Sequence, residues 1–347
     1  MTEFIDNQGR AFFTYEKGLQ SARKFVADNK AFRASGGSPY YVSNPVLGWT
    51  IAPNVKHSSR PYTSDAHGFR VTEAEQHADD DRPVVSVWGD SMVHGDGVAD
   101  SDAWPWLLAE RISDRFKVLN GGVSGYGSDQ GFLRLKKRAT KDKPHIALLS
   151  YATTDLFRHV NIYRTFLHHG GDFPFLKPRY AIRGKQPKLI RPPQTDECNV
   201  ADVLAQAETQ NFLKTHDLIY PGYLQQFGEK VLRKLGLVDF FDLKAGIKRQ
   251  ALDVTEAIFS DFKAYCEANN IRCAALLLPT YYGKYATGSD FDWLIRKFES
   301  IGLEYVDLRH EFRDQSSYEY EDLYVQGNHY GRRSGEWISN RLAAYLE

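Results

Sequence analysis

The stretch that decides the fold is PVVSVWGDS, residues 83–91, in which a compact apolar run ends at a glycine and small polar residues follow. The run Val84–Trp88 lies between polar flanks, which is the pattern of a parallel β-strand covered on both faces. Ser91 then follows the carboxyl end of this strand, where open α/β sheets bind ligands. A serine placed there can act as a nucleophile if the fold brings a histidine to take its proton.

Helices and strands alternate on the carboxyl side of this strand. A helix is expected over 103–112, with Ser101 or Asp102 as its cap and Pro105 in its first turn. The stretch KVLNGGVSGYG (117–127) is expected to be a short strand that runs into a Gly-rich turn. The other core elements expected from apolar periodicity are strands near 145–152, 271–279 and 303–308, and helices near 128–140, 255–269, 290–300 and 334–346. This alternation with short connections predicts right-handed βαβ units and a parallel sheet.

Two regions depart from this alternation. Residues 1–82 are expected to form a helix near 14–29 and a strap rich in Gly, Pro, Ser and Asn, both packed on the core. Residues 83–347 form the main domain, with an insertion at about 158–250 that is too long for an ordinary connection. Inside the insertion we expect a hairpin turning near 184–185 and helices near 200–215 and 223–235.

The charge balance bears on possible partners. The chain of 347 residues has 44 Lys and Arg against 44 Asp and Glu, so its net charge is zero, which argues against nucleic acid as a partner. Residues 158–249 hold 15 basic and 9 acidic side chains, a surplus of 6. Six of the cations lie in and around the expected hairpin: Lys177, Arg179, Arg183, Lys185, Lys188 and Arg191. We interpret them as a solvated hairpin face, with contact to an anionic substrate or partner as the alternative.

Several other classes of protein are disfavoured. The three cysteines, Cys198, Cys266 and Cys273, cannot form a disulfide framework and lack the spacing of a zinc site, so we expect reduced thiols and no metal. No window approaches the roughly 18 apolar residues of a membrane span, and the N-terminus has no apolar secretory segment. A cytoplasmic protein without a membrane partner is expected.

Motifs over nearly the whole chain resemble those of the SGNH, or GDSL-like, hydrolase superfamily. They are LGWTIAPN (47–54), HGFR (67–70), VSVWGDSMVHGDGVADSDAWPWLLAERI (85–112), VLNGGVSGYGSDQ (118–130) and GNHYGRRSG (327–335). The resemblance implies a three-layer, flavodoxin-like α/β fold. It also implies that Ser91 is the nucleophile and one oxyanion donor, that Gly125 gives a second oxyanion donor, and that His329 is the general base.

Two positions depart from the superfamily pattern. The third block usually has an Asn before its Asp, and here Thr154 stands at that place, with a shorter side chain that must rotate to donate. The acid usually found three residues before the histidine is replaced by Gln326, whose neutral amide can orient an imidazole but cannot stabilise an imidazolium as a carboxylate does. Asp322, Asp307 or a backbone carbonyl are the alternatives.

Further polar side chains lie near the same sheet edge. Asp90, beside the nucleophile, is a candidate for orienting or lining the pocket. His94 and Asp96 follow one turn later and either line the pocket mouth or are solvated loop residues. Asp155, Arg158 and His159 follow the strand at 145–152 as candidate substrate contacts, with a structural Asp155–Arg158 ion pair as the alternative. Ser124 is interpreted as a turn residue.

The expected function is hydrolysis of an O-acyl ester, often an O-acetyl ester, of a carbohydrate or small metabolite through a Ser91 acyl-enzyme. No metal or organic cofactor is expected. Two alternatives stay open: an acyltransferase that moves the acyl group to a hydroxyl acceptor, and a non-catalytic binding protein on the same scaffold.

Overall fold

The structure is a computed structural model of the whole chain. It describes residues 15–73, 81–152, 154–167, 173–183, 186–220, 240–279, 289–309, 312, 320–325 and 328–347. The chain divides into two compact units. Unit 1 comprises Met1–Ser38, Val42–Trp49 and Val160–Leu252, and unit 2 comprises Pro39–Tyr41, Thr50–His159 and Asp253–Glu347. The domain boundary predicted at residue 82 stays a prediction.

Unit 2 is built on a five-stranded parallel sheet. Its strands are β3 (Val84–Gly89), β4 (Lys117–Gly122), β5 (Ile146–Ala152), β8 (Arg272–Leu278) and β9 (Glu304–Asp307). They lie in the order β4-β3-β5-β8-β9, and every neighbouring pair is parallel. This is the flavodoxin-like order, so the expected fold class is confirmed. The order reverses at β3, whose carboxyl end is therefore at the ligand-binding crevice of such sheets.

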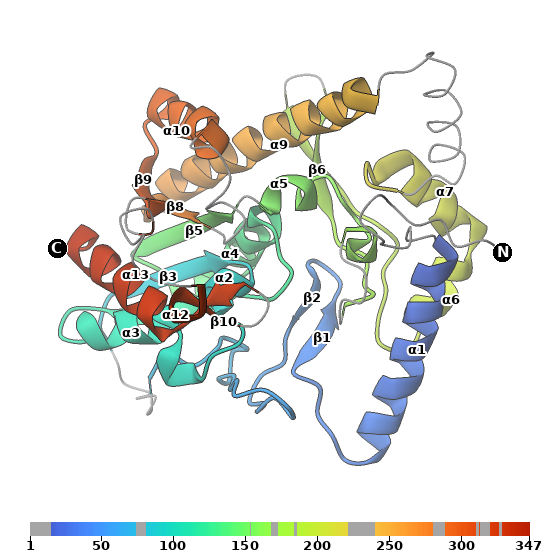
Figure 1. Cartoon of the computed structure of the whole chain (residues 1–347), viewed down its shortest axis with the longest axis horizontal. Helices are drawn as coiled ribbons and strands as arrows, with labels where there is room; N and C mark the ends of the chain where they lie inside the picture. The colour runs from blue at the N-terminus through green and yellow to red at the C-terminus, as the bar shows by residue number, and fades with distance from the viewer. Residues whose placement is uncertain are drawn as a thin grey trace. The chain divides into compact units, whose positions relative to one another are not determined.

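Helices cover both faces of this sheet (Figure 1). Those of unit 2 are α2 (Ser91–His94), η1 (Asp100–Asp102), α3 (Trp104–Arg111), α4 (Ser128–Asp142), α5 (Asp155–Arg158), α10 (Ser289–Ile301), α12 (Tyr320–Leu323) and α13 (Arg332–Tyr345). The long α9 (Phe240–Ala268) begins in unit 1 and ends in unit 2. A small antiparallel pair, β10 (Tyr324–Val325) and β11 (His329–Tyr330), precedes α13.

The core of unit 2 follows from the alternation of side chains along β5. Leu148 points to the face where Trp104 of α3 and Ile338 of α13 are buried in the same apolar cluster. Tyr151 points to the opposite face and contacts the rings of Phe259 in α9 and Phe291 in α10. Both faces of the central strands are therefore buried, which explains why they are apolar throughout.

Unit 1 holds α1 (Tyr15–Ala34) and most of the inserted segment. Its other elements are η2 (Arg164–Phe166), β6 (Arg179–Arg183), β7 (Gln186–Ile190), α6 (Val200–Ala205) and α7 (Ala207–His216). The antiparallel pairing of β6 with β7 confirms the predicted hairpin. A separate two-stranded sheet consists of β1 (Tyr41–Asn44) and β2 (Gly48–Ile51).

Some element boundaries differ from those predicted. The helix expected over 200–215 is two helices, because Gln206 has an extended backbone, φ −69° and ψ 136°. Helix α9 starts at Phe240 rather than near 255, since its earlier residues hold no proline to stop it. The expected caps Ser101 and Asp102 are wrong: they lie in η1, and Ala103 is the N-cap of α3. The helix expected near 223–235 lies outside the described residues.

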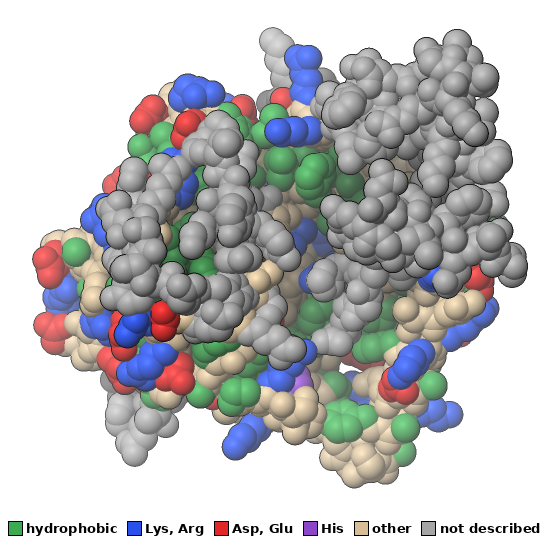
Figure 2. Space-filling model, viewed as in Figure 1, with side chains coloured by type: hydrophobic (Ala, Val, Ile, Leu, Met, Phe, Trp, Pro, Cys, Tyr) green, Lys and Arg blue, Asp and Glu red, His purple; other side chains and the backbone are tan. Residues whose placement is uncertain are grey.

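Charges of both signs intermingle over α3 and α13 on the face shown in Figure 2. This agrees with the zero net charge of the chain. In the part of the chain that the structure describes, no helix is both long and apolar enough to cross a membrane.

Candidate active site

Ser91 is the first residue of α2, the four-residue helix that follows β3. Asp90 is the N-cap of this helix, and its Oδ1 accepts the backbone N–H of Met92 at 2.9 Å. At the other end the N–H groups of Gly95 and Asp96 both donate to the Ser91 carbonyl, at 2.9 and 3.0 Å. The helix is thus capped at both ends. Among the described residues the Ser91 N–H has no acceptor, so it remains able to donate to a ligand.

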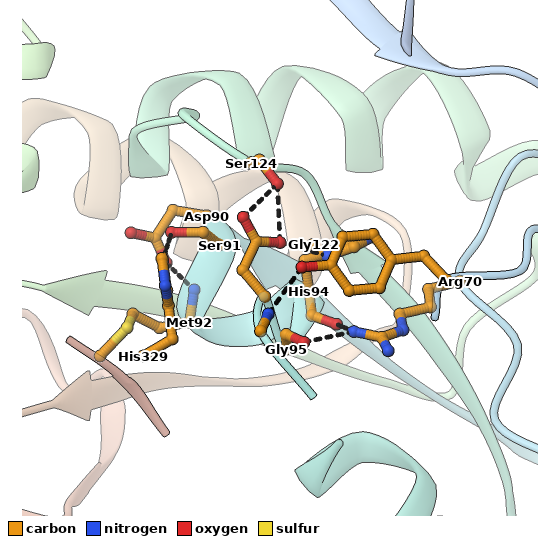
Figure 3. A network of polar contacts seen from close by, with 12 residues as sticks. Arg70, Asp90, Ser91, Met92, His94, Gly95, Gly122, Ser124 and His329 are labelled. Atoms are coloured by element: carbon orange, nitrogen blue, oxygen red, sulfur yellow. Dashed lines mark hydrogen bonds and ion pairs between the residues drawn. The ribbon is translucent and has the colours of Figure 1, made fainter. Parts of the chain in front are cut away.

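The two residues predicted to be nucleophile and base are brought together (Figure 3). His329 Nε2 lies 2.8 Å from Ser91 Oγ, although the two residues are 238 positions apart in the chain. This distance falls within the range of about 2.6–3.2 Å in which a general base takes a proton. To act as the base, Nε2 must be unprotonated and accept the serine O–H, which needs the tautomer with its proton on Nδ1.

A tight hairpin presents His329 to the serine. Val325 of β10 pairs with His329 of β11, and Asn328 between them has φ +63°, a left-handed conformation that Asn tolerates. Successive side chains in a strand point to opposite sides, so Tyr330 is buried while His329 is turned toward Ser91. The Tyr330 hydroxyl donates to the Pro279 carbonyl at 2.5 Å, which fastens the hairpin just past the end of β8.

Gly125 lies in a turn at the end of the neighbouring strand, β4. The Tyr126 N–H donates to the Val123 carbonyl at 3.2 Å, and Gly125 has φ +82°. A positive φ at the third residue is what a type II turn requires, and glycine provides it without strain. The Val123 N–H donates to the Gly89 carbonyl at 3.0 Å. This bond fastens the turn to the end of β3, next to Ser91.

The third predicted oxyanion donor lies at the start of α5. The Thr154 side chain is exposed and makes no capping hydrogen bond, so its predicted role stays a prediction. The next residue, Asp155, is fully buried and accepts the Ser128 hydroxyl at 3.1 Å and the Ala152 N–H at 3.3 Å. Burial raises the pKa of Asp155, and the nearby Asp90 carboxylate adds to the rise.

Gln326, Asp322, Asp307 and a backbone carbonyl are the groups predicted to orient the His329 ring, and these assignments stay predictions. Gln326 lies outside the described residues. Asp322 is exposed on α12. The Asp307 carboxylate accepts hydrogen bonds from Arg309 Nε at 2.9 Å and Nη2 at 2.7 Å, so it is already paired.

A buried polar chain begins one turn after the serine. The Ser124 hydroxyl lies 2.7 Å from both carboxylate oxygens of Asp96, and His94 Nδ1 lies 2.6 Å from Oδ1. Tyr41 contacts the Ser124 hydroxyl at 2.5 Å, and Tyr40 contacts His94 Nε2 at 3.0 Å. Burial opposes ionisation of Asp96, but His94 and the Ser124 hydroxyl outweigh it and hold the pKa of Asp96 well below its usual range.

Arg158 is a site residue whose full set of contacts the sequence does not reveal. Its Nη1 donates to Asp90 Oδ2 at 2.8 Å, to the Tyr126 carbonyl at 2.7 Å and to Asp155 Oδ1 at 3.1 Å. The predicted Asp155–Arg158 pair is present, but the contacts with Asp90 and Tyr126 join segments that the sequence cannot place together. Ser124 likewise does more than occupy a turn, because it bonds to Asp96.

The arrangement has the parts needed for acyl transfer. It has a serine hydroxyl, an imidazole within hydrogen-bonding distance, and backbone N–H groups beside the serine. No group of three or more His, Cys, Asp or Glu side chains that could hold a metal ion occurs among the described residues. None of the three cysteines forms a disulfide.

Comparison with known proteins gives likenesses in structure only. No protein-family model matches the chain, and no curated protein does. Solved structures similar to it include a lipolytic protein assigned to the G-D-S-L family from Desulfitobacterium hafniense, at 11% identity, TM-score 0.40, and coverage of 76% of this chain and 99% of that one. An esterase from a Pseudoalteromonas species has 11% identity, TM-score 0.40, and coverage of 76% and 96%.

An acetylxylan esterase from Geobacillus stearothermophilus is similar at 10% identity and TM-score 0.41, with coverage of 77% of this chain and 94% of that one.

Proposed function

We propose that the chain is an SGNH-type serine hydrolase that cleaves an O-acyl ester, with Ser91 as nucleophile and His329 as general base. The observation that carries the proposal is the 2.8 Å contact between His329 Nε2 and Ser91 Oγ at the carboxyl end of β3. Nucleophilic catalysis by serine needs this contact, because the free hydroxyl is a weak nucleophile.

The proposed reaction has two acyl transfers. His329 Nε2 takes the proton of Ser91 Oγ, which attacks the ester carbonyl carbon and gives a tetrahedral oxyanion. The oxyanion collapses, the alcohol leaves with the proton from His329, and an acyl ester on Ser91 remains. Water then attacks this ester while His329 takes its proton, and the carboxylic acid and free Ser91 are released.

The proposed oxyanion hole uses the N–H groups of Ser91 and Gly125, with the Thr154 hydroxyl as a third donor. The lack of a described acceptor for the Ser91 N–H supports the first assignment. The left-handed turn at Gly125, fastened to β3, supports the second. Preorganised donors of this kind are usually the largest contribution to acyl-transfer catalysis.

The substrate class proposed from the family resemblance is an acyl ester, such as an acetyl ester, of a carbohydrate or small metabolite. We propose no cofactor, and we propose the cytoplasm as the compartment.

The test is turnover of p-nitrophenyl acetate by the wild type and by Ser91→Ala and His329→Ala. Loss of a triad member costs roughly 10⁴–10⁶ in kcat in serine hydrolases, so we expect neither variant to turn over measurably. Ser113→Ala and His67→Ala are the matched controls, since both side chains are exposed and neither lies in the site. Undiminished turnover by Ser91→Ala would refute the proposal.

Adding hydroxyl acceptors separates hydrolysis from transfer. A hydrolase releases acetate at the same rate with or without a sugar acceptor. A product acylated on the acceptor, formed faster than acetate, would indicate the acyltransferase. A folded wild type that turns over no ester and transfers no acyl group would indicate the non-catalytic alternative.

A further inference from the structure

Two side chains outside the proposed dyad and oxyanion hole, Arg158 and Asp96, connect the same two turns from opposite ends. One turn leads from β3 into α2 and ends at Ser91, and the other carries Gly125. The contacts are specific in position, because each reaches either a proposed oxyanion donor or the residue directly beside one. This inference rests on the function proposed above.

The first connection runs through Arg158. Its Nη1 donates to the carboxylate of Asp90, the residue before Ser91, and to the carbonyl of Tyr126, the residue after Gly125. Asp90 in turn caps α2 through the Met92 N–H. One charged nitrogen therefore fixes the separation of the two turns on this side. Its third acceptor, Asp155, is the residue after Thr154.

The second connection runs through Asp96. Its backbone N–H donates to the Ser91 carbonyl at 3.0 Å, and its carboxylate lies 2.7 Å from the hydroxyl of Ser124, the residue before Gly125. A carboxylate that is ionised only accepts hydrogen bonds, so Ser124 must donate to Asp96. The Tyr41 hydroxyl, 2.5 Å from Ser124, must then donate to the Ser124 oxygen. The hydrogen bonds therefore run in one direction, from Tyr41 to Ser124 and from Ser124 to Asp96.

We infer that Arg158 and Asp96 are positioning residues that hold the Ser91 and Gly125 N–H groups at the spacing a tetrahedral oxyanion requires. Both connections are largely withdrawn from water: the side chains of Arg158 and Asp90 are 16% and 2% exposed, and Asp96 is 9% exposed. Charge-assisted hydrogen bonds in such surroundings are short and directional. Neither residue is assigned contact with the substrate.

The structure offers a matched control for Arg158. Arg138 pairs with Asp142 inside α4, and its side chain is 17% exposed, nearly the same as Arg158. Arg138→Ala therefore removes an arginine of equal burial that contacts neither turn. An arginine with a purely structural role should behave as this control does.

The experiment compares the wild type with Arg158→Ala, Arg158→Lys and Arg138→Ala. For each we measure the rate of labelling by a fluorophosphonate probe, kcat and KM for p-nitrophenyl acetate, and the thermal midpoint. A misplacement of about 1 Å at a reacting centre can cost about 10²-fold, so we expect Arg158→Ala to lose about that much in kcat and labelling, with KM changed less than about 3-fold. Arg158→Lys keeps the positive charge and a single donor nitrogen in place of the planar guanidinium, so its kcat and labelling rate should fall between those of the wild type and Arg158→Ala.

Two further readouts distinguish positioning from loss of stability. Millimolar guanidinium should restore part of the labelling rate of Arg158→Ala, and Asp96→Asn should also lower kcat more than it raises KM. Arg138→Ala should label at the wild-type rate even if its thermal midpoint falls. The inference is overturned if Arg158→Ala, or Arg158→Lys where the alanine variant does not fold, labels as fast as Arg138→Ala. A wild type that is not labelled at all would instead overturn the proposed function.

Discussion

A serine hydroxyl near neutral pH is almost entirely protonated, and Ser91 gains reactivity only from its surroundings. The imidazole of His329, whose Nε2 lies 2.8 Å from Ser91 Oγ, can accept the hydroxyl proton. Because Ser91 is the first residue of α2, its N–H has no acceptor within the helix. The same residue can therefore offer both the nucleophile and an oxyanion donor. The proposed reactivity of Ser91 thus depends on its contact with His329 and on the availability of its own N–H.

Thr154→Ala measures the weakest of the three proposed oxyanion donors. A buried oxyanion donor typically contributes about 10²–10³ in kcat. Because the Thr154 side chain is exposed, its hydroxyl also bonds to water, and we expect Thr154→Ala to lower kcat less than about tenfold, by steady-state kinetics on p-nitrophenyl acetate. A drop of three orders of magnitude would contradict this expectation.

Asp96→Asn tests the ionised state of the buried carboxylate through the pH dependence of stability. The pKa of Asp96 in the folded chain is below its ordinary value, since His94, His329 and Ser124 together outweigh the effect of burial. The stabilisation from ionised Asp96 is therefore complete above a pH of about 4 and is lost as the pH falls further.

We expect the unfolding free energy of the wild type to exceed that of Asp96→Asn at pH 6, by urea denaturation. The gap should narrow as the pH falls from about 4 toward 2. A gap that widens on the acid side would show that Asp96 is protonated in the folded chain.

At the scale of elements, the site depends on how closely the end of β4 approaches α2. A Cβ atom at Gly122 would lie 2.3 Å from the backbone N of His94 and 2.7 Å from the backbone C of Val93. These are backbone atoms of α2, so they cannot move aside as a flexible side chain would. Only glycine at this position allows α2, and with it Ser91, to sit against the strand.

Gly122→Ala should therefore displace α2. Overpacking of this kind costs about 1–3 kcal/mol, and we expect a loss of at least that size in the unfolding free energy together with a fall in kcat. Gly246→Ala is the control: it lies in α9, and no atom of the described residues lies within 4 Å of its added Cβ. In a helix that change should be neutral or stabilise by up to about 1 kcal/mol. Equal effects of the two substitutions would contradict the close approach.

At the scale of the whole molecule, every residue of the proposed machinery belongs to unit 2. Ser91, Gly125 and Thr154 lie in its segment Thr50–His159, and His329 lies in Asp253–Glu347. The ends of these two segments are near one another, because His159 Nδ1 contacts Thr255 Oγ1 at 2.7 Å. A short linker can therefore replace the inserted residues 160–252.

We expect a chain of residues 39–159 joined through a Gly-Ser linker to 253–347 to unfold cooperatively and to be labelled by a fluorophosphonate probe. Circular dichroism on heating checks the first expectation, and gel fluorescence checks the second. A cooperatively folded chain that is not labelled, while the full-length protein is, would show that the removed residues are needed for the reacting centre.

Much of this organisation could be predicted from the sequence. The apolar run before Gly89 predicts a buried parallel strand. The motifs at Ser91, Gly125 and His329 identify candidates that the structure places at the start of α2, in the turn after β4 and in β11, with His329 in contact with Ser91. The bonds from Arg158 to Asp90 and Tyr126 could not be predicted, because they join three loops whose spacing depends on the register of the sheet. The break at Gln206 could not be predicted either, since glutamine is a good helix former and its extended backbone has no signal in the sequence.

The role of Ser91 is tested most directly by identifying the residue that a fluorophosphonate probe modifies, by peptide mapping of the labelled full-length protein. We predict one modified residue, Ser91, with labelling abolished in Ser91→Ala and strongly slowed in His329→Ala. Modification at another serine, or equal labelling of the wild type and Ser91→Ala, would contradict the assignment of Ser91 as the nucleophile.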